Sequence, residues 1–347
     1  MPLSIDVNGM LRFLEQLLAI PSPVGDTHRA IEFVRSAFAD LGLKTDVPPK
    51  GYLTATWEIE GSDTPRAVSA HIDTLGAMVS KLKENGRVSL TKLGGWDWTS
   101  VEGEGVSVLL NSGETIRGSI LPVKASGHAY TTKERTAERT GDTMEARLDV
   151  VAETADDLGN LGVRIGDTVA IDPRIEITDT GFVRSRHLDD KAGIACIYGA
   201  LAAIRSAGHQ PSQRTTAHIS NYEEVGHGGS VGFPPDLAEL LVVDMAVVAP
   251  TLSGSERKVT ICAKDASGPY DSRLRRRLEE ICATEKIDYV SDIYPYYGSD
   301  GSVYWRTGGS ALVGLVGPGV DASHHYERTH RDGLEQTARL VAAYLLS

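Results

Sequence analysis

The sequence predicts an α/β protein into which a second, β-rich domain is inserted. Residues 1–76 and 176–347 alternate apolar strand patterns with helical patterns. Between them, residues 77–175 contain short alternating runs and many glycines, without a long helical pattern. Because strands that alternate with helices form α/β sheets, we expect the two outer stretches to fold as one discontinuous domain. Residues 77–175 are expected to form a small β-barrel or sandwich.

The first stretch contains two helical patterns followed by two strand patterns. The first helix is predicted by apolar residues on one face, followed by two prolines: Met10, Leu11, Leu14, Leu17, Leu18, Pro21 and Pro23. A second helix is expected to begin at Asp26 or Thr27 and to end at Gly42. Residues 52–59 and 66–73 have the composition and alternation of strands.

Beyond the β-rich segment, strand and helix patterns alternate again. The predicted helices cover residues 191–208, 271–286 and 331–346. The predicted buried strands cover residues 214–220, 240–249 and 311–316. This second α/β stretch therefore supplies most of the expected sheet.

Composition excludes several classes of partner. The formal net charge of −12 argues against binding to nucleic acid or to an anionic membrane, since phosphate binding requires clustered lysine and arginine. No apolar run approaches the ~18 residues typical of a membrane-spanning helix. The N-terminal stretch lacks a basic segment and is interrupted by Glu15, so we do not expect a signal peptide. Three cysteines without a CxxC pair indicate a reducing compartment, and we expect a cytoplasmic protein.

Acidic residues and histidines cluster where the predicted strands end, and open α/β sheets bind their ligands there. The cluster consists of His71, Asp73, Asp189, Asp190, Glu223, Glu224, Asp244 and the histidines of residues 322–330. Taken singly, most have simpler explanations, such as a helix N-cap at Asp189–Asp190 or a solvated surface pair at Glu223–Glu224. Asp244 is harder to explain, because a carboxylate in an apolar strand costs several kcal/mol unless it is compensated. Together, these oxygen and imidazole groups suit Zn²⁺, Mn²⁺ or Co²⁺.

The stretch NYEEVGHGG (221–229) places two carboxylates side by side. Two cations about 3.5–4 Å apart would favour the ionised acids, which otherwise repel each other. One of Glu223 and Glu224 could then bind metal while the other acts as a general base. Neighbouring residues of a regular strand face opposite sides, so both acids reach one centre only if the strand has already ended. The glycines that follow are suited to such an ending.

Several motifs, taken in order, resemble the dinuclear-metal aminopeptidases of the tetrahedral-assembly (TET) family, also described as glutamyl or deblocking aminopeptidases. They are SAHIDTLGAMV (69–79), LGGWD (93–97), GVRIGDTV (162–169), RHLDDKAGIA (186–195), NYEEVGHGGS (221–230) and VVDMA (242–246). The resemblance covers nearly the whole chain. It implies an α/β/α metallopeptidase sandwich with a mixed sheet, interrupted by a PDZ-like β-barrel.

The resemblance also implies roles for individual residues. His71, Glu224, Asp244 and a C-terminal histidine match metal ligands, and Asp189 matches the carboxylate that bridges two metals. Glu223 matches the catalytic base, and Asp73 matches the aspartate that orients His71. Asp190 occupies a position where the family also accepts asparagine, so it is the weaker ligand candidate.

The chain departs from the family pattern at three places. Thr74 and Lys191 stand where the family usually has glutamate and arginine. The final histidine usually lies in an Arg-Tyr-x-His-Ser context, whereas SHHYERTH (323–330) offers His324, His325 and His330. His324 is favoured because it follows the last predicted strand most closely. These departures bear on substrate preference more than on chemistry.

The sequence therefore predicts a metal-dependent aminopeptidase with two divalent ions per subunit, Zn²⁺ being favoured over Co²⁺ or Mn²⁺. The resemblance further implies a homo-oligomer, in the family a twelve-subunit shell. One alternative is a deacylase or dipeptidase that acts on a small amide metabolite through the same metals. Another is a non-catalytic assembly or binding protein with a residual site. A glycosidase is disfavoured, because its two carboxyls must flank a sugar, whereas Glu223 and Glu224 stand adjacent among further acids and histidines, which fits metal binding better.

Overall fold

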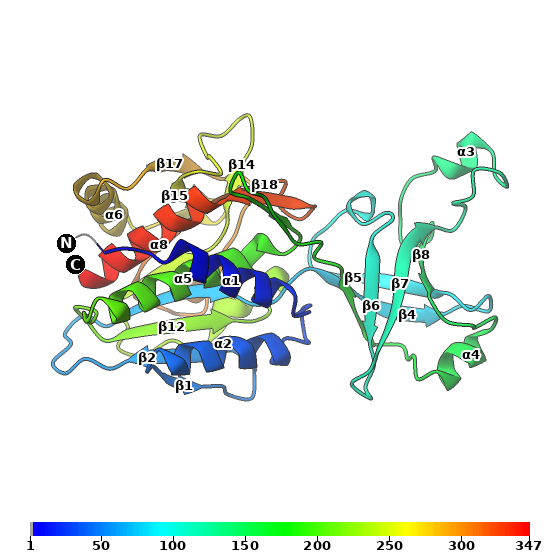
Figure 1. Ribbon diagram of the computed structural model, residues 1–347, viewed down its shortest axis with the longest axis horizontal. Coiled ribbons are helices and arrows are strands. Elements are labelled where there is room, and N and C mark those ends of the chain that lie inside the picture. Colours follow the sequence, from blue (N-terminus) through cyan, green and yellow to red (C-terminus); the bar gives the residue numbers. More distant parts are fainter. Residues whose placement is uncertain (1–2) are drawn as a thin grey trace. The chain divides into compact units, whose positions relative to one another are not determined.

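The computed structural model describes residues 3–347, which divide into two compact units (Figure 1). The first unit contains the described residues up to Pro21 together with Thr27–Asp73 and Arg174–Ser347. The second unit contains Ser22–Asp26 and Thr74–Pro173. None of the described helices is long and apolar enough to cross a membrane.

A mixed β-sheet forms the centre of the first unit. Its strands are β1 (Lys44–Asp46), β2 (Leu53–Trp57), β3 (Arg66–His71), β10 (Glu176–Ile177), β11 (Phe182–Ser185), β12 (Thr215–Ser220), β13 (Glu239–Val243), β14 (Ala246–Val248), β15 (Val259–Asp265), β16 (Gly268–Pro269), β17 (Tyr289–Ile293), β18 (Leu312–Asp321) and β19 (Glu327–His330). The main path runs β1-β2-β12-β3-β13-β18-β19-β11-β10. The neighbours β12, β3, β13 and β18 are parallel, so their C-terminal ends lie at one edge. We call this edge, at the ends of β3, β12 and β13, the carboxyl edge.

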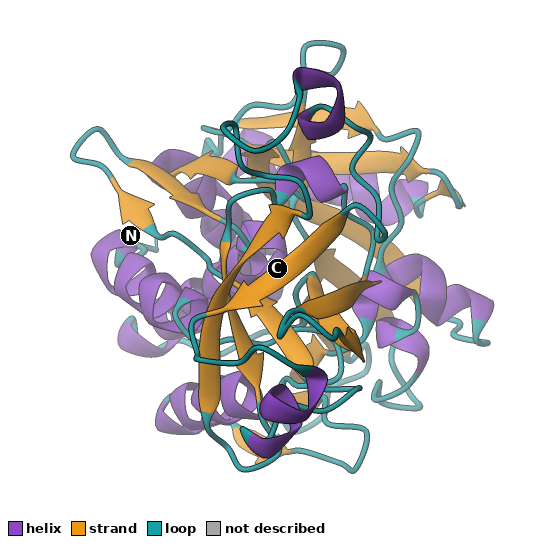
Figure 2. Ribbon diagram, turned by 90° about the vertical axis from the view of Figure 1, so that its right-hand side faces the viewer, coloured by secondary structure: helices purple, strands orange, loops and turns teal. Residues whose placement is uncertain are grey.

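Helices cover both faces of this sheet. They are α1 (Val7–Leu18), α2 (His28–Asp40), α5 (Leu188–Ser206), α6 (Ser272–Glu285), α7 (Asp300–Arg306) and α8 (Arg331–Leu346). Strand β13 shows the division, because its side chains alternate between two apolar cores. Leu241 and Val243 pack with α1, α2, α5, α6 and α8, whereas Leu240 and Val242 pack with Tyr304 of α7. Figure 1 shows α1, α5 and α8 side by side, and in Figure 2 the helices (purple) flank the strands (orange).

The second unit is a closed antiparallel barrel with strand order β4-β5-β8-β7-β6-β9. Its elements are β4 (Gly76–Leu82), β5 (Val88–Leu93), η1 (Trp98–Ser100), β6 (Gly105–Leu109), β7 (Thr115–Pro122), α3 (Thr132–Arg135), β8 (Met144–Leu148), α4 (Ala155–Asn160) and β9 (Thr168–Ile171). Buried residues such as Val79, Val106, Ile120 and Val169 fill its interior. The predicted fold class, an α/β sandwich with a mixed sheet and an inserted β-barrel, is confirmed.

Two differences from the sequence prediction bear on the site. The strand predicted over residues 240–249 stops at Val243 and resumes at Ala246, which leaves Asp244 outside the regular ladder. The short helix α7 was not predicted at all. Its N-terminus has a capping box formed by Ser299 and Ser302, which lacks the glutamate or glutamine of the usual signal.

A buried ionic cluster joins the sheet to α6 and α8. Arg66 on β3 and Glu239 on β13 are register neighbours, with Arg66 Nε 3.2 Å from Glu239 Oε2. Arg277 also pairs with this carboxylate, and Tyr344 Oη donates to it at 3.0 Å. Burial alone would raise the pKa of Glu239, but the Arg277 and Arg66 guanidiniums hold it below its ordinary value. The ionised carboxylate therefore stabilises the fold.

We expect Glu239→Gln to lower the free energy of unfolding by about 1–3 kcal/mol at pH 7, since buried Arg66 loses its carboxylate partner while Arg277 is 35% exposed and can be solvated. The pKa of Glu239 is lowered on folding from 4.5, so its stabilisation is complete above that pH and is lost as the pH falls through the folded value. The difference between variant and wild type should therefore shrink below pH 4.5. Urea denaturation at a series of pH values measures it.

The control is Glu32→Gln, which removes the exposed pair with Arg35 on α2 and should change stability little. An equal loss in the two variants, or a loss independent of pH, would contradict the role of the cluster.

Candidate metal centre

The carboxyl edge brings together side chains from distant parts of the sequence. His71 is the last residue of β3, and Asp244 follows directly after β13. Ser220, the last residue of β12, is the register neighbour of His71. The chain leaves β12 there and forms the 3₁₀ turn η2 (Glu223–Val225). The parallel sheet therefore delivers these groups to one place.

Two further residues come from outside the sheet edge. Asp189 lies in the first turn of α5, where its backbone angles are not helical. His324 lies in the loop between β18 and β19 and has a left-handed backbone with φ +65°. Both residues approach the groups at the carboxyl edge.

Asp189 lies between the two histidines. Its Oδ1 atom is 3.0 Å from His71 Nε2, and its Oδ2 atom is 3.4 Å from His324 Nε2. Asp244 Oδ1 is 4.0 Å from His71 Nε2, and Glu224 Oε2 is 3.7 Å from His324 Nε2. These distances link His71 to Asp189 and Asp244, and His324 to Asp189 and Glu224, so Asp189 adjoins both histidines. The groups whose ligand atoms all lie within 4.8 Å of one another are His71–Asp189–Glu224 and His71–Asp190–Asp244.

Asp190 also has an oxygen atom close to the ring of His71 and to the carboxylate of Asp244. Its own oxygens, however, accept backbone bonds, from His71 N at 3.3 Å and Gly193 N at 3.2 Å. Asp190 is fully buried and does not line the cavity described below. We therefore regard it as a support for His71 rather than as a ligand.

The paired glutamates both face the same cavity because they lie on a turn rather than on a strand. Tyr222 and Gly226, on either side of η2, have left-handed backbones with φ +66° and +83°. Glu223 Oε2 lies 3.9 Å from His71 Nε2, while Glu224 faces His324. Strand β12 therefore ends before the two acids, as the sequence predicted.

The carboxylate of Asp73 lies closer to the paired glutamates than to the ring of His71. Its carboxylate accepts the backbone N–H of Glu223 at 3.1 Å and that of Glu224 at 3.2 Å. His71 Nδ1 lies 2.9 Å from the main-chain oxygen of Asp73 and 3.8 Å from the carboxylate. A carbonyl oxygen only accepts, so Nδ1 carries the proton and Nε2 is left to bind a cation. Sequence reasoning assigned the orienting role to the side chain of Asp73, whereas its main chain makes this contact.

The electrostatics of the cluster fit bound cations. Burial raises the pKa of Glu223 and Glu224 well above the ordinary value, and raises that of Asp244 to about 7. Burial would also raise the pKa of Asp189, but His324 and His71 bring it below the ordinary value. Glu224 Oε1 is buried without a hydrogen-bond partner among the described residues. Divalent cations would favour the ionised acids and satisfy this oxygen, so the residues present fit two metal ions.

Other histidines of the C-terminal motif have different roles. His330 is the N-cap of α8, where Nδ1 accepts from Asp332 N, and its Nε2 lies 3.0 Å from Thr180 O. His325 is exposed, and its main-chain oxygen accepts from Arg186. Among the three candidates, His324 alone has a ring nitrogen facing Asp189 and Glu224, whereas His330 Nδ1 faces Asp332.

Sequence reasoning missed Glu327, which supports two of the candidate ligands. Its carboxylate is 2% exposed and accepts from His324 N at 3.0 Å and from Asp189 N at 3.1 Å. Burial, together with Asp189, raises its pKa to about 8. Glu327 lies in a polar stretch without strand or helix periodicity, so only its spacing from His324 could have indicated it.

Asp300, the first residue of α7, supports the loop of the paired glutamates and was also missed. It accepts from Ser220 Oγ and, at 2.6 Å, from Gly229 N. A Cβ on Gly229 would lie 2.2 Å from the main-chain oxygen of Asp300. A Cβ on Gly228 would lie 2.5 Å from Oδ1 of Asp300. The two glycines of GHGG are therefore required by this close approach.

A cavity of about 280 Å³ opens over the cluster. Its lining comprises Asp189, Glu223, Glu224, Gly226, Asp244, Tyr296, Tyr297, Gly298, Ser299, Val303, Arg306 and His324. Tyr297 Oη donates to the main-chain oxygen of Met245 at 2.9 Å, next to Asp244. Loop 294–302, left open by the sequence as either a pocket wall or a turn, thus forms one wall of this cavity.

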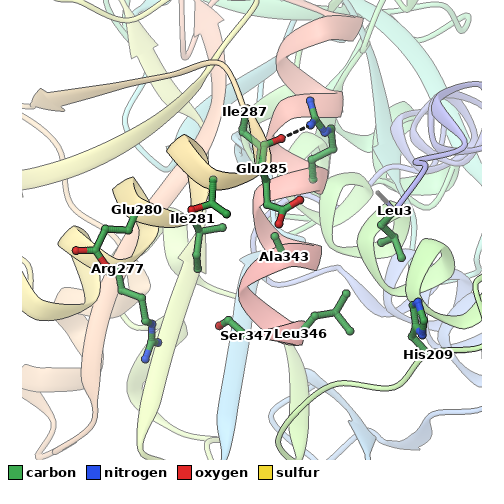
Figure 3. Close-up of a pocket in the computed structure, with 12 residues that line it drawn as sticks. Leu3, His209, Arg277, Glu280, Ile281, Glu285, Ile287, Ala343, Leu346 and Ser347 are labelled. Atoms are coloured by element: carbon green, nitrogen blue, oxygen red, sulfur yellow. Dashed lines mark hydrogen bonds between the residues drawn. The ribbon is translucent and has the colours of Figure 1, made fainter. Parts of the chain in front are cut away.

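The first unit also has a larger cavity, of about 440 Å³, at the surface of α6 and α8 (Figure 3). Leu3, Ile281, Ile287 and Leu346 supply apolar walls, and Arg339 donates across it to Glu285 O at 2.8 Å. None of the candidate ligands lines it. The candidate metal ligands therefore lie in the smaller of the two cavities.

The fold and the cluster define a class of protein, a hydrolase with candidate metal-binding residues at the carboxyl edge of an α/β sheet. A family model described as M42 glutamyl aminopeptidase matches residues 51–340. The chain is 41% identical over 343 residues to "Putative aminopeptidase YhfE" of Bacillus subtilis (strain 168), with 98% of each chain covered. The chain therefore belongs to the M42 glutamyl aminopeptidase family, and it is a metallopeptidase hydrolase.

Solved structures share the fold. A TET aminopeptidase from the marine sediment archaeon Thaumarchaeota archaeon SCGC AB-539-E09 has a TM-score of 0.88 at 16% identity, with 98% of this chain and 97% of that chain covered. The TET1 peptidase of Pyrococcus horikoshii, described as assembling into a tetrahedron or a large octahedral shell, has a TM-score of 0.85 at 21% identity, with 97% and 99% covered. The predicted resemblance to the TET aminopeptidases is confirmed.

We expect Glu327→Gln to weaken metal binding about 10- to 100-fold. Glutamine keeps one acceptor oxygen but turns an amide nitrogen toward the other N–H donor, so either His324 or Asp189 loses its support. Equilibrium dialysis against buffered Zn²⁺ measures the affinity, with the exposed Glu280→Gln as the control. Equal affinities in the two variants would show that Glu327 does not position the ligands.

Proposed function

We propose that this protein removes N-terminal residues from peptides through a dinuclear metal centre. His71, Asp189 and Asp244 would hold one ion, and His324, Asp189 and Glu224 the other. The observation that carries the proposal is that the two oxygens of Asp189 face the two histidines, at 3.0 Å and 3.4 Å. Two imidazoles with carboxylates favour Zn²⁺, and Co²⁺ and Mn²⁺ accept the same donors.

The two cations, when bound, supply Lewis-acid charge that polarises the scissile carbonyl and lowers the pKa of the attacking water. Glu223 is the proposed general base, because it lines the cavity and belongs to neither set of ligands. Its Oε2 atom takes a proton from the water and passes it to the nitrogen of the leaving amine. Asp73 holds Glu223 for this task by accepting its backbone N–H.

The proposal extends to assembly and location. The fold resembles that of a TET1 peptidase described as assembling into a tetrahedron or a large octahedral shell, and that of PhTET1-12s, described as a dodecamer; both support a homo-oligomer. Three free cysteines, all buried, are in keeping with the reducing cytoplasm.

Glu223→Gln and Glu224→Gln make a matched pair, because they change adjacent residues by the same single atom. We expect Glu223→Gln to keep two metal ions per chain while kcat falls by about 10²–10⁴-fold, since only proton transfer is lost. We expect Glu224→Gln to lose metal, since it removes a ligand. Elemental analysis after dialysis and peptide turnover measure both. A Glu223→Gln enzyme with undiminished turnover would remove this residue from the role of base.

A substrate panel tests the reaction itself. Aminoacyl amides and short peptides are compared with N-acyl amino acids, each in Zn²⁺, Co²⁺ and Mn²⁺. We expect turnover of the substrates with a free α-amino group. Turnover of N-acyl amino acids alone would indicate a deacylase with the same centre.

A further inference from the structure

Strand β18 supports the candidate ligand Asp244 from one side only. Strands β13 and β14 pair with β18 in one continuous register, which places Met245 opposite Pro318. Asp244 N donates to Val316 O at 3.0 Å, which continues the ladder by one bond. Pro318 has no N–H group, so it cannot donate to the chain beyond this point. The main chain directly after Asp244 therefore depends on a contact from outside the sheet.

Tyr297, on the cavity loop 294–302, provides such a contact. Its Oη atom donates to Met245 O at 2.9 Å. Met245 is 2% exposed, so its main-chain oxygen is shielded from water, and solvent cannot freely replace this hydrogen bond. The main-chain oxygen of Tyr297 in turn accepts from Ala266 N at 3.0 Å, which holds the loop in place. The chain is thus fixed again directly after Asp244.

The same hydroxyl also faces the carboxylate of the candidate ligand. Tyr297 and Asp244 both line the cavity. Burial raises the pKa of Asp244 to about 7, and His71 and the hydroxyl of Tyr297 counteract this rise. A phenol has one proton to donate, so the hydroxyl serves the carboxylate and Met245 O in turn. Tyr297 therefore contacts both the ligand and the residue that follows it.

We propose that Tyr297 is a positioning residue for Asp244, which it holds ready for a metal ion by fixing the main chain of the next residue. This inference rests on the proposed dinuclear centre. A buried acceptor without its donor is costly, so loss of the hydroxyl favours a movement of Met245 O toward another donor. Because Met245 is bonded to Asp244, this movement displaces the carboxylate, whose Oδ1 atom lies 4.0 Å from His71 Nε2.

Tyr297→Phe removes the hydroxyl and keeps the ring. Titration with Co²⁺, followed by visible absorption and by metal content after dialysis, measures the binding of each of the two ions. We expect this variant to weaken one binding step about 10- to 100-fold and to leave the other unchanged, since only the ion at Asp244 loses a supported ligand. Excess metal should restore kcat, because the hydroxyl acts on the ligand rather than on the substrate.

Tyr294→Phe is the matched control. Tyr294 is a buried residue of the same loop, and its ring centroid lies 5.2 Å from that of Tyr297. It does not line the cavity over the candidate ligands. The control therefore removes a neighbouring phenol hydroxyl and should bind both ions as wild type does.

A double variant separates the support of one ligand from a general loss of packing. Asp244→Asn removes the carboxylate, so the binding step that depends on it is lost. Adding Tyr297→Phe should then cause no further loss of metal affinity, because the two changes act through the same ligand. A further loss at the remaining ion would show that the hydroxyl supports the cavity as a whole, which would overturn the proposal.

Other outcomes would also reject the role of Tyr297. These are unchanged binding of both ions in Tyr297→Phe, and a kcat that stays low at saturating metal, which would indicate that the hydroxyl contacts the reacting substrate. Fewer than two ions bound by wild type would overturn the proposed centre and this inference together. A wild type that binds two ions but hydrolyses no peptide would count against the peptidase proposal alone.

Discussion

The chain gathers eight carboxylates at the carboxyl edge of one sheet, and the rest of the site depends on how their charge is compensated. They are Asp73, Asp189, Asp190, Glu223, Glu224, Asp244, Asp300 and Glu327. Four of them, Asp73, Asp190, Asp300 and Glu327, accept N–H or O–H donors from the segments that carry the ligands. The other four line the cavity, where Asp189 faces two histidines and Glu224 leaves an oxygen without a partner. Isolated buried charges are costly, and in the proposed centre two cations compensate the charge of this second group.

This division explains what could be predicted from the sequence and what could not. The ligand candidates were predictable because parallel strands end at one edge, and histidines or acids lie at or near the ends of several predicted strands. The acids that accept backbone N–H groups were harder to predict from the sequence. Glu327 and Asp300 act through backbone groups far away in the sequence, such as Asp189 N and Gly229 N, and no local pattern records such contacts.

Contacts between distant segments also limited the prediction of the fold. An apolar face with helical periodicity predicted α1 and α8, and a long, mostly apolar segment that ends near Gly208 predicted α5, because such patterns are local properties. The seven residues of α7 offer no such pattern, and their position depends on contacts of Asp300 and Tyr304 with other segments. Similarly, a run of apolar residues predicted one strand through Asp244, while the structure interrupts the ladder there. The interruption leaves the carboxylate free to turn toward His71.

Glycines fix the backbone of the loop that carries the paired glutamates. Adjacent acids can share one cavity only on a turn, and the turn η2 is held from two sides, by Asp73 through the amides of Glu223 and Glu224 and by Asp300 through Gly229. The second contact leaves no room for a Cβ, which is why the motif ends in two glycines. Since the backbone of the turn is fixed in this way, the side chains of Glu223 and Glu224 diverge toward His71 and His324. Two neighbouring glutamates can then take different roles, because their surroundings differ although their side chains are chemically identical.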